Sequence, residues 1–226
     1  MNTLLEKYLP NVLFNQEEFV QAIFDTLTMV SISGAVSLVL GTFVGILLVV
    51  TREGNILENK AVQKILSQTI NVFRSIPFII LLAALLPLTR AIVGTGIGTK
   101  GAIVPLVFGT VPYLARQMDT ALSEVSNGVI EAAQAMGSSP WEIIFRVYLR
   151  EGLPGIIRGI TITAVSLIGL SAMAGSIGGG GLGDFAIRYG YQRNHNDVTY
   201  VTVAVILVMV TILQSIGSYF VKRTTH

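Results

Sequence analysis

The sequence predicts an all-α, polytopic membrane protein with about five transmembrane helices, on the strength of three observations. Charged residues are only 12% of the 226 residues, about half the share of an ordinary globular chain. Hydrophobic residues are 52% of the chain and the mean hydropathy is +0.69, which is more apolar surface than one soluble core of this size can bury. The charges also lie between long uncharged runs, and the net charge of only +2 argues against a nucleic-acid partner.

Residues 1–20 are expected to form a short external amphipathic segment. A cleaved signal peptide would begin with basic residues and continue into a sustained apolar run. This stretch has neither feature and carries Glu6, Glu17 and Glu18 instead. The first membrane span is therefore expected to begin after Asp25.

Three uncharged runs are long enough to cross a bilayer as helices, which takes about 20 residues. They cover residues 26–51, 159–183 and 198–221, with 26, 25 and 24 residues. Within the first run, Gly41 and Gly45 form a G-x-x-x-G pattern. This pattern predicts close packing against another helix, because glycine lets two backbones approach.

Two shorter runs, residues 75–89 and 101–115, hold 15 residues each and complete the five spans. Flanking Lys and Arg side chains can reach the membrane surface while each run stays in lipid. Pro77 lies inside the first of these runs and should kink it, because proline lacks an N–H and its ring collides with the preceding turn. Buried helices of a soluble domain are the alternative, which the three long neighbouring spans disfavour.

The distribution of Lys and Arg predicts the orientation of the chain. The segments on one side of the predicted membrane hold ten of these residues, and the segments on the other side hold five. The more positive side is normally cytoplasmic. The N-terminus is therefore expected outside and the C-terminus in the cytoplasm, with residues 116–158 forming a cytoplasmic loop.

This loop carries signals for two short helices joined by a glycine turn. Ser126 or Asn127 can cap the first helix, and Gly137 is a natural stop for it. Ser139 and Glu142 then form a capping box that starts the second helix. Either another protein docks on this loop, or the loop lies on the chain's own bundle. The apolar residues at helical spacing are Ile130, Ala133, Ile143, Ile144, Val147 and Tyr148.

Six residues of the loop stand at a recognisable spacing: Glu131, Ala132, Ala133, Gly137, Val147 and Leu149. They resemble the EAA loop of the permease subunits of bacterial ABC importers. Arg150 stands where the family pattern has proline, which leaves the end of the second helix open. The stretches 73–82, 171–173 and 180–183 resemble methionine-importer permeases in particular, and the resemblance covers roughly residues 20–220.

The resemblance implies one transmembrane domain over residues 1–226, the permease subunit of an ATP-driven importer. It would translocate methionine across a prokaryotic cell membrane by alternating access. The implied assembly is a homodimer in membrane lipid with two cytoplasmic ATPase subunits, which bind ATP and Mg²⁺, and an external substrate-binding protein. The chain has no G-x-x-x-x-G-K-[ST] motif, so ATP hydrolysis is expected of a partner subunit and not of this chain. It has no cysteine and only two histidines, so no metal or other cofactor is expected of it. By this resemblance, the coupling residues are Glu131, Ala132, Ala133, Met136 and Gly137.

The glycine-rich stretch 175–183 is expected to break the fourth span. It contains one G-x-G-x-x-G match, as does the stretch 96–101, but neither lies in a strand-to-helix turn, so nucleotide binding is not expected. Irregular backbone at membrane depth is tolerated only inside protein or beside water. The stretch therefore predicts a loop or re-entrant turn that lines a translocation path, with a flexible connector as the alternative.

A path through these spans suits a net-neutral ligand, because no charged residue lies deep in a span. Hydroxyls and opened backbone can hold a zwitterion, and Met173 offers a soft apolar gate. His195 stands apart from any nucleophile or metal-ligand pattern, so no catalytic set is expected. The candidate path residues are Ser166, Ser171, Met173 and Gly175.

Two alternatives stay open. Within the importer family, the substrate could instead be another small amino acid, a short peptide or an osmoprotectant. A stand-alone channel or secondary carrier also fits the hydropathy, but it leaves the capped cytoplasmic loop without a purpose. Co-purification of an ATPase would exclude that class.

Overall fold

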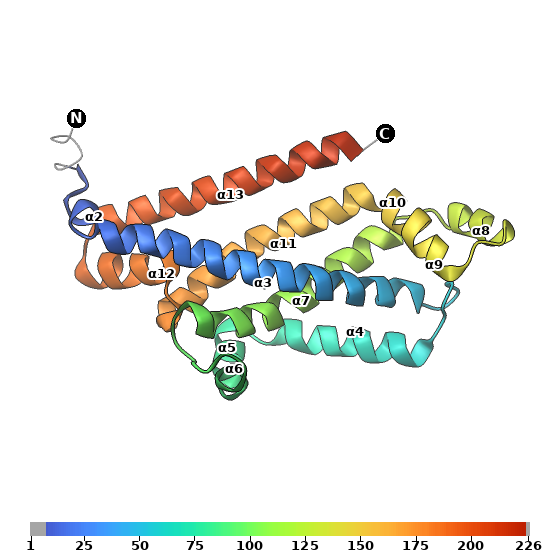
Figure 1. The fold of residues 1–226 in the computed structure, drawn as a ribbon, viewed down its shortest axis with the longest axis horizontal. Helices are drawn as coiled ribbons and strands as arrows, with labels where there is room; N and C mark the ends of the chain where they lie inside the picture. Colours follow the sequence, from blue (N-terminus) through green and yellow to red (C-terminus); the bar gives the residue numbers. More distant parts are fainter. Residues whose placement is uncertain (1–7, 225–226) are drawn as a thin grey trace. The chain divides into compact units, whose positions relative to one another are not determined.

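The computed structural model describes residues 8–224, and the regular elements among them are all helical (Figure 1). The predicted all-α class is therefore confirmed. Residues 1–7 of the predicted external segment and His226 lie outside the described residues; the rest of that segment enters α2 and the start of α3. The four long helices are α3 (Gln16–Val50), α7 (Gly98–Ser123), α11 (Leu153–Ala174) and α13 (Asn196–Thr224). The shorter α-helices are α2 (Pro10–Phe14), α4 (Lys60–Ser75), α5 (Phe78–Ala84), α6 (Leu86–Val93), α8 (Asn127–Ala135), α9 (Pro140–Glu142), α10 (Leu149–Glu151) and α12 (Gly181–Phe185).

Three helices of the described part are long and apolar enough to cross a membrane: α3, the helix over Leu153–Gly179, and α13. They correspond to the three long uncharged runs. Two further pairs meet the same criterion together but are bent, α4 with α5 by 103° and α6 with α7 by 118°. By length and composition, the described chain therefore has three candidate spans, or up to five if each bent pair is one span, which agrees with the predicted number of about five.

The stretch predicted as the second span, residues 75–89, is not one helix. α4 ends at Ser75, Ile76 is extended, and Pro77 stands immediately before α5. This is the conformation that a proline imposes on the residue before it, so the predicted kink is a complete break. α4 was not predicted, because it is an amphipathic helix whose Lys60 and Lys64 exclude it from the uncharged runs. The third predicted span, residues 101–115, lies within α7.

The described residues form two compact units, and each of the four long helices contributes residues to both units. The first unit holds the described residues up to Gly34, Pro77–Val107 and Ala164–Ile212. The second unit holds Ala35–Ile76, Phe108–Thr163 and the stretch from Leu213 to the end of α13. Each unit has its own apolar core.

In the second unit, α3 and α7 pack closely because of the predicted glycine pattern. An ideal Cβ on Gly41 would lie 2.9 Å from Cβ of Leu114, and one on Gly45 would lie 2.8 Å from the carbonyl oxygen of Ala115. A larger residue at either position would force the helices apart, which confirms the packing prediction for this pair. The core beside them also takes in residues of the α8 loop, which is the segment 124–152 between α7 and α11. Members of this core include Val49, Met118, Leu122, Ile130, Ala133, Ile143, Ile144 and Tyr148.

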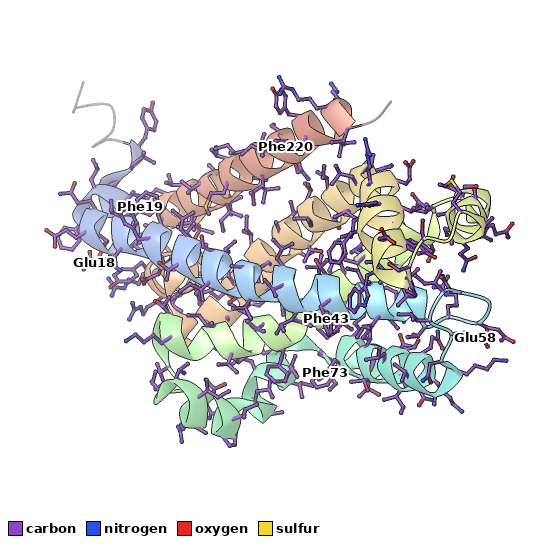
Figure 2. All side chains as sticks on the ribbon, turned by 45° about the vertical axis from the view of Figure 1, so that its right-hand side comes forward. Glu18, Phe19, Phe43, Glu58, Phe73 and Phe220 are labelled. Carbon is purple, nitrogen blue, oxygen red and sulfur yellow. The ribbon has the colours of Figure 1, made fainter. Side chains whose placement is uncertain are left out.

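In the first unit, α12 packs against the N-terminal part of α3. The ring centres of Phe19 (labelled in Figure 2) and Phe185 are 5.2 Å apart. The hydroxyl of Thr26 accepts a 2.8 Å hydrogen bond from the N–H of Leu182, which satisfies a donor at the start of α12. Leu182 and Phe185 are both buried, so α12 is fixed on α3 by its side chains and its backbone.

Candidate functional site

α8 buries one face in its own unit and leaves the other bare. Ile130 and Ala133 are buried in the core of the second unit. The residues on the other side are exposed: Glu131, Ala132, Gln134, Ala135 and Met136. The buried face confirms that part of the loop lies on the chain's own bundle, and docking of another protein on the exposed face stays a prediction. Ser126 occupies the N-cap position, but its side chain makes no capping hydrogen bond.

Gly137 ends α8 in the left-handed conformation, with φ +83°. The N–H of Ser138 donates to the carbonyl of Ala133 (3.1 Å) and the N–H of Gly137 donates to that of Gln134 (2.9 Å). This is the Schellman arrangement, which satisfies the last carbonyls of the helix. An ideal Cβ on Gly137 would meet no atom of this chain within 4 Å. The backbone angle, and not a lack of space, therefore requires glycine here, and the predicted helix stop is confirmed.

The predicted capping box starts the next helix. The N–H and the hydroxyl of Ser139 each donate to Oε2 of Glu142 at 2.9 Å, and the N–H of Glu142 donates back to the Ser139 hydroxyl at 3.4 Å. The backbone hydrogen bond from Ser139, followed by its hydroxyl, lowers the pKa of the Glu142 carboxyl. The turn between α8 and α9 is therefore fixed by local hydrogen bonds on both sides.

The second helix is confirmed, but part of it has an unexpected form. It continues from α9 into a π-helix, η1 (Ile143–Tyr148), and then into α10. Arg150, which stands where the resembled pattern has proline, is exposed within α10. The helix ends at Gly152, so this departure does not disturb the loop.

Three large apolar side chains on this loop are exposed; Met136 was among the predicted coupling residues, whereas Trp141 and Phe145 were not predicted from the sequence. Met136, Trp141 and Phe145 are 79%, 67% and 63% exposed. The rings of Trp141 and Phe145 stack with their centres 6.4 Å apart. Large apolar residues that are exposed together mark a contact surface. The sequence signal for Trp141 and Phe145 was their position in and directly after the Ser139–Glu142 capping box.

An ion network around the buried Asp119 ties α7 to α4 and to the segment that follows α3, in the second unit. The Asp119 side chain is 7% exposed, and its two oxygens accept hydrogen bonds from Arg52 (2.7 Å) and Arg116 (2.9 Å). Arg116 also donates to Ser67 and Asn71 of α4, at 3.3 and 3.1 Å. Two arginines that converge on one buried carboxylate hold the loop side of these helices in one arrangement. Sequence analysis missed the network, because Arg52 and Asp119 are 67 residues apart.

A polar cavity of about 280 Å³ lies between the segment after α3 and α8, within the second unit. Glu131 and Gln134 line it from α8, and Arg52 and Asn55 line it from the other side. The Tyr148 hydroxyl donates to Oδ1 of Asn55 at 2.9 Å, and burial raises the pKa of Tyr148. Glu131 therefore borders an open polar space that Arg52 of the ion network also lines.

The predicted path residues lie on α11 and just after it, in the first unit, and differ sharply in exposure. Ser171 is buried and its hydroxyl donates to the carbonyl of Ile168 at 2.7 Å, within its own helix. Gly175 is also buried. The backbone of α12 packs closely on it, since an added Cβ would lie 2.6 Å from the backbone nitrogen of Asp184. Ser166 is half-buried, whereas Met173 is 43% exposed. Of the four, Met173 is the one that stands open.

The glycine-rich stretch does break the fourth helix. Ile177 (φ −119°, ψ 28°) and Gly178 (φ 95°) leave helical geometry, and Gly180 and Gly181 both have φ 75°. α12 then folds back so closely that a Cβ on Gly183 would lie 2.6 Å from Cα of Ala172. The stretch is a tightly packed reversal of the chain, and the flexible-connector alternative does not describe it.

The segment after α12 carries a cluster of rings and charges. Arg188 pairs with Asp184 at 2.9 Å, and the guanidiniums of Arg188 and Arg193 lie 5.0 and 4.7 Å from the ring centre of Tyr189. A cavity of about 400 Å³ beside it is lined by three further carboxylates, Glu17, Glu18 and Asp25. Within residues 8–224, no group of three His, Asp or Glu side chains could hold a metal ion.

Comparison with known proteins gives a consistent result. Residues 37–226 match the family described as binding-protein-dependent transport system inner membrane component. A probable D-methionine transport system permease protein MetI of Vibrio cholerae is 47% identical over 212 residues, 94% of each chain. The methionine import system permease protein MetP of Bacillus subtilis is 46% identical and aligns over 95% of this chain and 96% of its own. A chain from an inward-facing structure of the methionine ABC transporter MetNI superposes with a TM-score of 0.91 at 42% identity, over 94% of this chain and 98% of that one.

Proposed function

Because this chain belongs to the family of binding-protein-dependent transport system inner membrane components, we propose that it is the permease subunit of an ATP-driven importer that carries methionine across the cell membrane. The observation that carries this proposal is that full-length relatives at nearly half identity are named for methionine transport. The helical fold and the bare face of α8 support it. ATP-dependent uptake of methionine into vesicles that contain this chain and an ATPase subunit tests it.

The proposed assembly contains two copies of this chain as single transmembrane domains, two ATPase subunits that bind ATP and Mg²⁺, and an external substrate-binding protein. The ATPase is needed because the chain has no phosphate-binding loop of its own. Among the predicted coupling residues, Glu131, Ala132 and Met136 are exposed and can contact a partner. Ala133 is buried, so its role is to fasten α8 to the core.

The coupling works through packing. The ATPase pushes on the bare face of α8, and the buried face passes this movement on, because Ile130 and Ala133 share one core with residues of α3, α7 and η1. The Schellman turn and the capping box keep the loop stiff enough to transmit a displacement. A partner can shift the equilibrium between two arrangements of a permease helix only by the difference between its binding free energies for those two arrangements. The chain therefore provides the translocation path, and ATP hydrolysis by the partner subunits provides the free energy for transport.

The path suits methionine because it holds no deep charge, and a net charge at the bilayer centre costs several kcal/mol. Met173 is proposed as the gate: at 43% exposure on α11, its flexible thioether can meet its own copy across a two-fold axis. Met173→Ala is expected to leave a closed permease leaky, or to raise ATP turnover without substrate, at normal expression. Tracer leak and basal ATP turnover in reconstituted vesicles measure this. Ile92→Ala, which truncates an apolar side chain that is 59% exposed on α6, is the control, and equal behaviour of both variants removes the gate assignment.

We also propose that the N-terminus lies outside and the α8 loop in the cytoplasm, from the excess of Lys and Arg on the loop side. The chain has no cysteine, so single cysteines report topology without background. Glu124→Cys, in the loop before α8, and Gln192→Cys, after η3 (Ala186–Gly190), both replace exposed residues. An impermeant thiol reagent is expected to label only the second in intact cells and both after permeabilisation. Labelling of only the first in intact cells would reverse the orientation.

A further inference from the structure

A groove of about 320 Å³ lies between the start of α11 and the end of α13, within the second unit. Thr161 and Ile162 line it from α11, and Gly217 and Val221 line it from α13. The two helices touch here, because an ideal Cβ on Gly217 would lie 2.6 Å from Cγ2 of Thr161. The groove is thus bounded by a close helix contact, and its walls are mainly apolar.

Two basic side chains line the same groove. Arg158 lies in the second turn of α11, and Lys222 lies in the last turn of α13. Neither belongs to an ion pair found in the described part of the chain. Arg158 donates a long hydrogen bond, 3.4 Å, to the carbonyl of Pro154. Arg223, by contrast, has its guanidinium over the ring of Tyr219, 5.0 Å from the ring centre. Within the described part of the chain, Arg158 and Lys222 therefore have no ion-pair partner.

The groove also lies at the ends of two helices that are long and apolar enough to span a membrane. α11 starts directly after the α8 loop, and Lys222 is two residues before the end of α13, so both cations stand at the ends of spanning helices. Long basic side chains at such positions reach the headgroup level while their stems stay along apolar surface. Phe220, labelled in Figure 2, is 50% exposed near the same end of α13, which fits a lipid-facing surface.

We propose that this groove binds an anionic phospholipid of the leaflet on the α8 side. An acyl chain lies along Ile162 and Val221, and the phosphate sits between Arg158 and Lys222. A basic pocket between spanning helices attracts anionic headgroups, and hydrogen bonds from two cations to one phosphate are charge-assisted. A soluble anion would gain nothing from the apolar walls. A zwitterionic lipid would bring its own ammonium, so the two cations would remain unbalanced.

The test is lipid binding by the purified, delipidated full chain, measured by native mass spectrometry with phosphatidylglycerol and phosphatidylethanolamine as probes. We expect wild type to prefer phosphatidylglycerol. The double variant Arg158→Gln/Lys222→Gln is expected to lose this preference, with binding roughly 30-fold weaker at about 1 kcal/mol for each basic residue. The charge-preserving double variant Arg158→Lys/Lys222→Arg should retain binding. Arg188→Gln/Arg193→Gln removes two charges elsewhere and should also retain it.

Several results would overturn the proposal. Equal binding of the two lipids by wild type would contradict the proposed preference for an anionic lipid. This comparison uses wild type alone, so it does not depend on the folding of any variant. Displacement of the lipid by millimolar glycerol phosphate would show a headgroup site without an acyl groove. An equal loss of lipid binding in Arg158→Gln/Lys222→Gln and in Arg188→Gln/Arg193→Gln would show that the net charge of the protein, and not this groove, determines binding. The readout is binding and not transport, so its failure leaves the methionine proposal intact.

Discussion

A Gly137→Val variant is expected to insert into the membrane normally but to lose most ATP-driven uptake, at least tenfold. Gly137 has φ +83°, and a left-handed conformation costs an L-residue about 1–2 kcal/mol, more for a β-branched one. Valine would therefore favour a different backbone angle and break the two hydrogen bonds that close α8. The exposed face from Glu131 to Met136 would then be misdirected. Uptake and ATP turnover, measured together in reconstituted vesicles, report the loss of coupling.

Two control variants separate this effect from general strain. Gly94 has φ +77°, and an added Cβ there also meets nothing within 4 Å, so Gly94→Val carries the same backbone cost away from the α8 loop. It is expected to keep most uptake. Gly137→Asn should also keep most uptake, because asparagine tolerates the left-handed region. Normal uptake by Gly137→Val, or an equal loss in Gly94→Val, would contradict the role of the α8 loop.

Replacement of Asp119 by asparagine is expected to give a large loss of stability. Its carboxylate balances Arg52 and Arg116 in a site that leaves the Asp119 side chain only 7% exposed. Neutralising it leaves both guanidiniums facing one another without a counter-charge, which we expect to cost about 1–3 kcal/mol, since Arg52 remains partly solvated. Thermal unfolding of the purified protein in detergent measures the change.

The control for Asp119 is Asp184→Asn. Asp184 also pairs with an arginine at 2.9 Å, but Arg188 is 58% exposed, and exposed pairs contribute roughly 0–1 kcal/mol. The double variant Arg52→Gln/Asp119→Asn should recover part of the loss, because it removes one of the unbalanced charges. If the two Asp→Asn variants unfold at the same temperature, the network does not stabilise the helices as inferred.

The parts of the fold that are encoded locally could be predicted from the sequence. The three long uncharged runs emerged as the three longest apolar helices, because only a helix satisfies the backbone in lipid. The Gly137 turn and the Ser139–Glu142 capping box were also predictable, since each involves hydrogen bonds within five residues. The break of the fourth span followed from the density of glycine after Ala174.

The parts that were missed depend on residues far apart in the chain or on helix faces. The network around Asp119 joins α7 to α4 and to Arg52 after α3, and no local sequence pattern marks these contacts between distant segments. α4 has charged residues and so fell outside a search for uncharged runs, although its apolar Leu66 and Ile70 pack on the core. Among the small residues of α8, only the fold shows that Ala133 points inward. Likewise, Ser171 was a reasonable ligand for a zwitterion until its hydroxyl was found to bond within its own helix.

The most direct test of the proposed function is substrate uptake by vesicles that contain this permease, its ATPase subunit and ATP inside. Labelled methionine, a betaine and a dipeptide are offered separately, each together with the proposed substrate-binding protein. We expect ATP-dependent accumulation of methionine alone, and no accumulation when ATP or the ATPase is omitted. Accumulation of the betaine or the dipeptide instead of methionine, or methionine entry that does not require ATP, would contradict it.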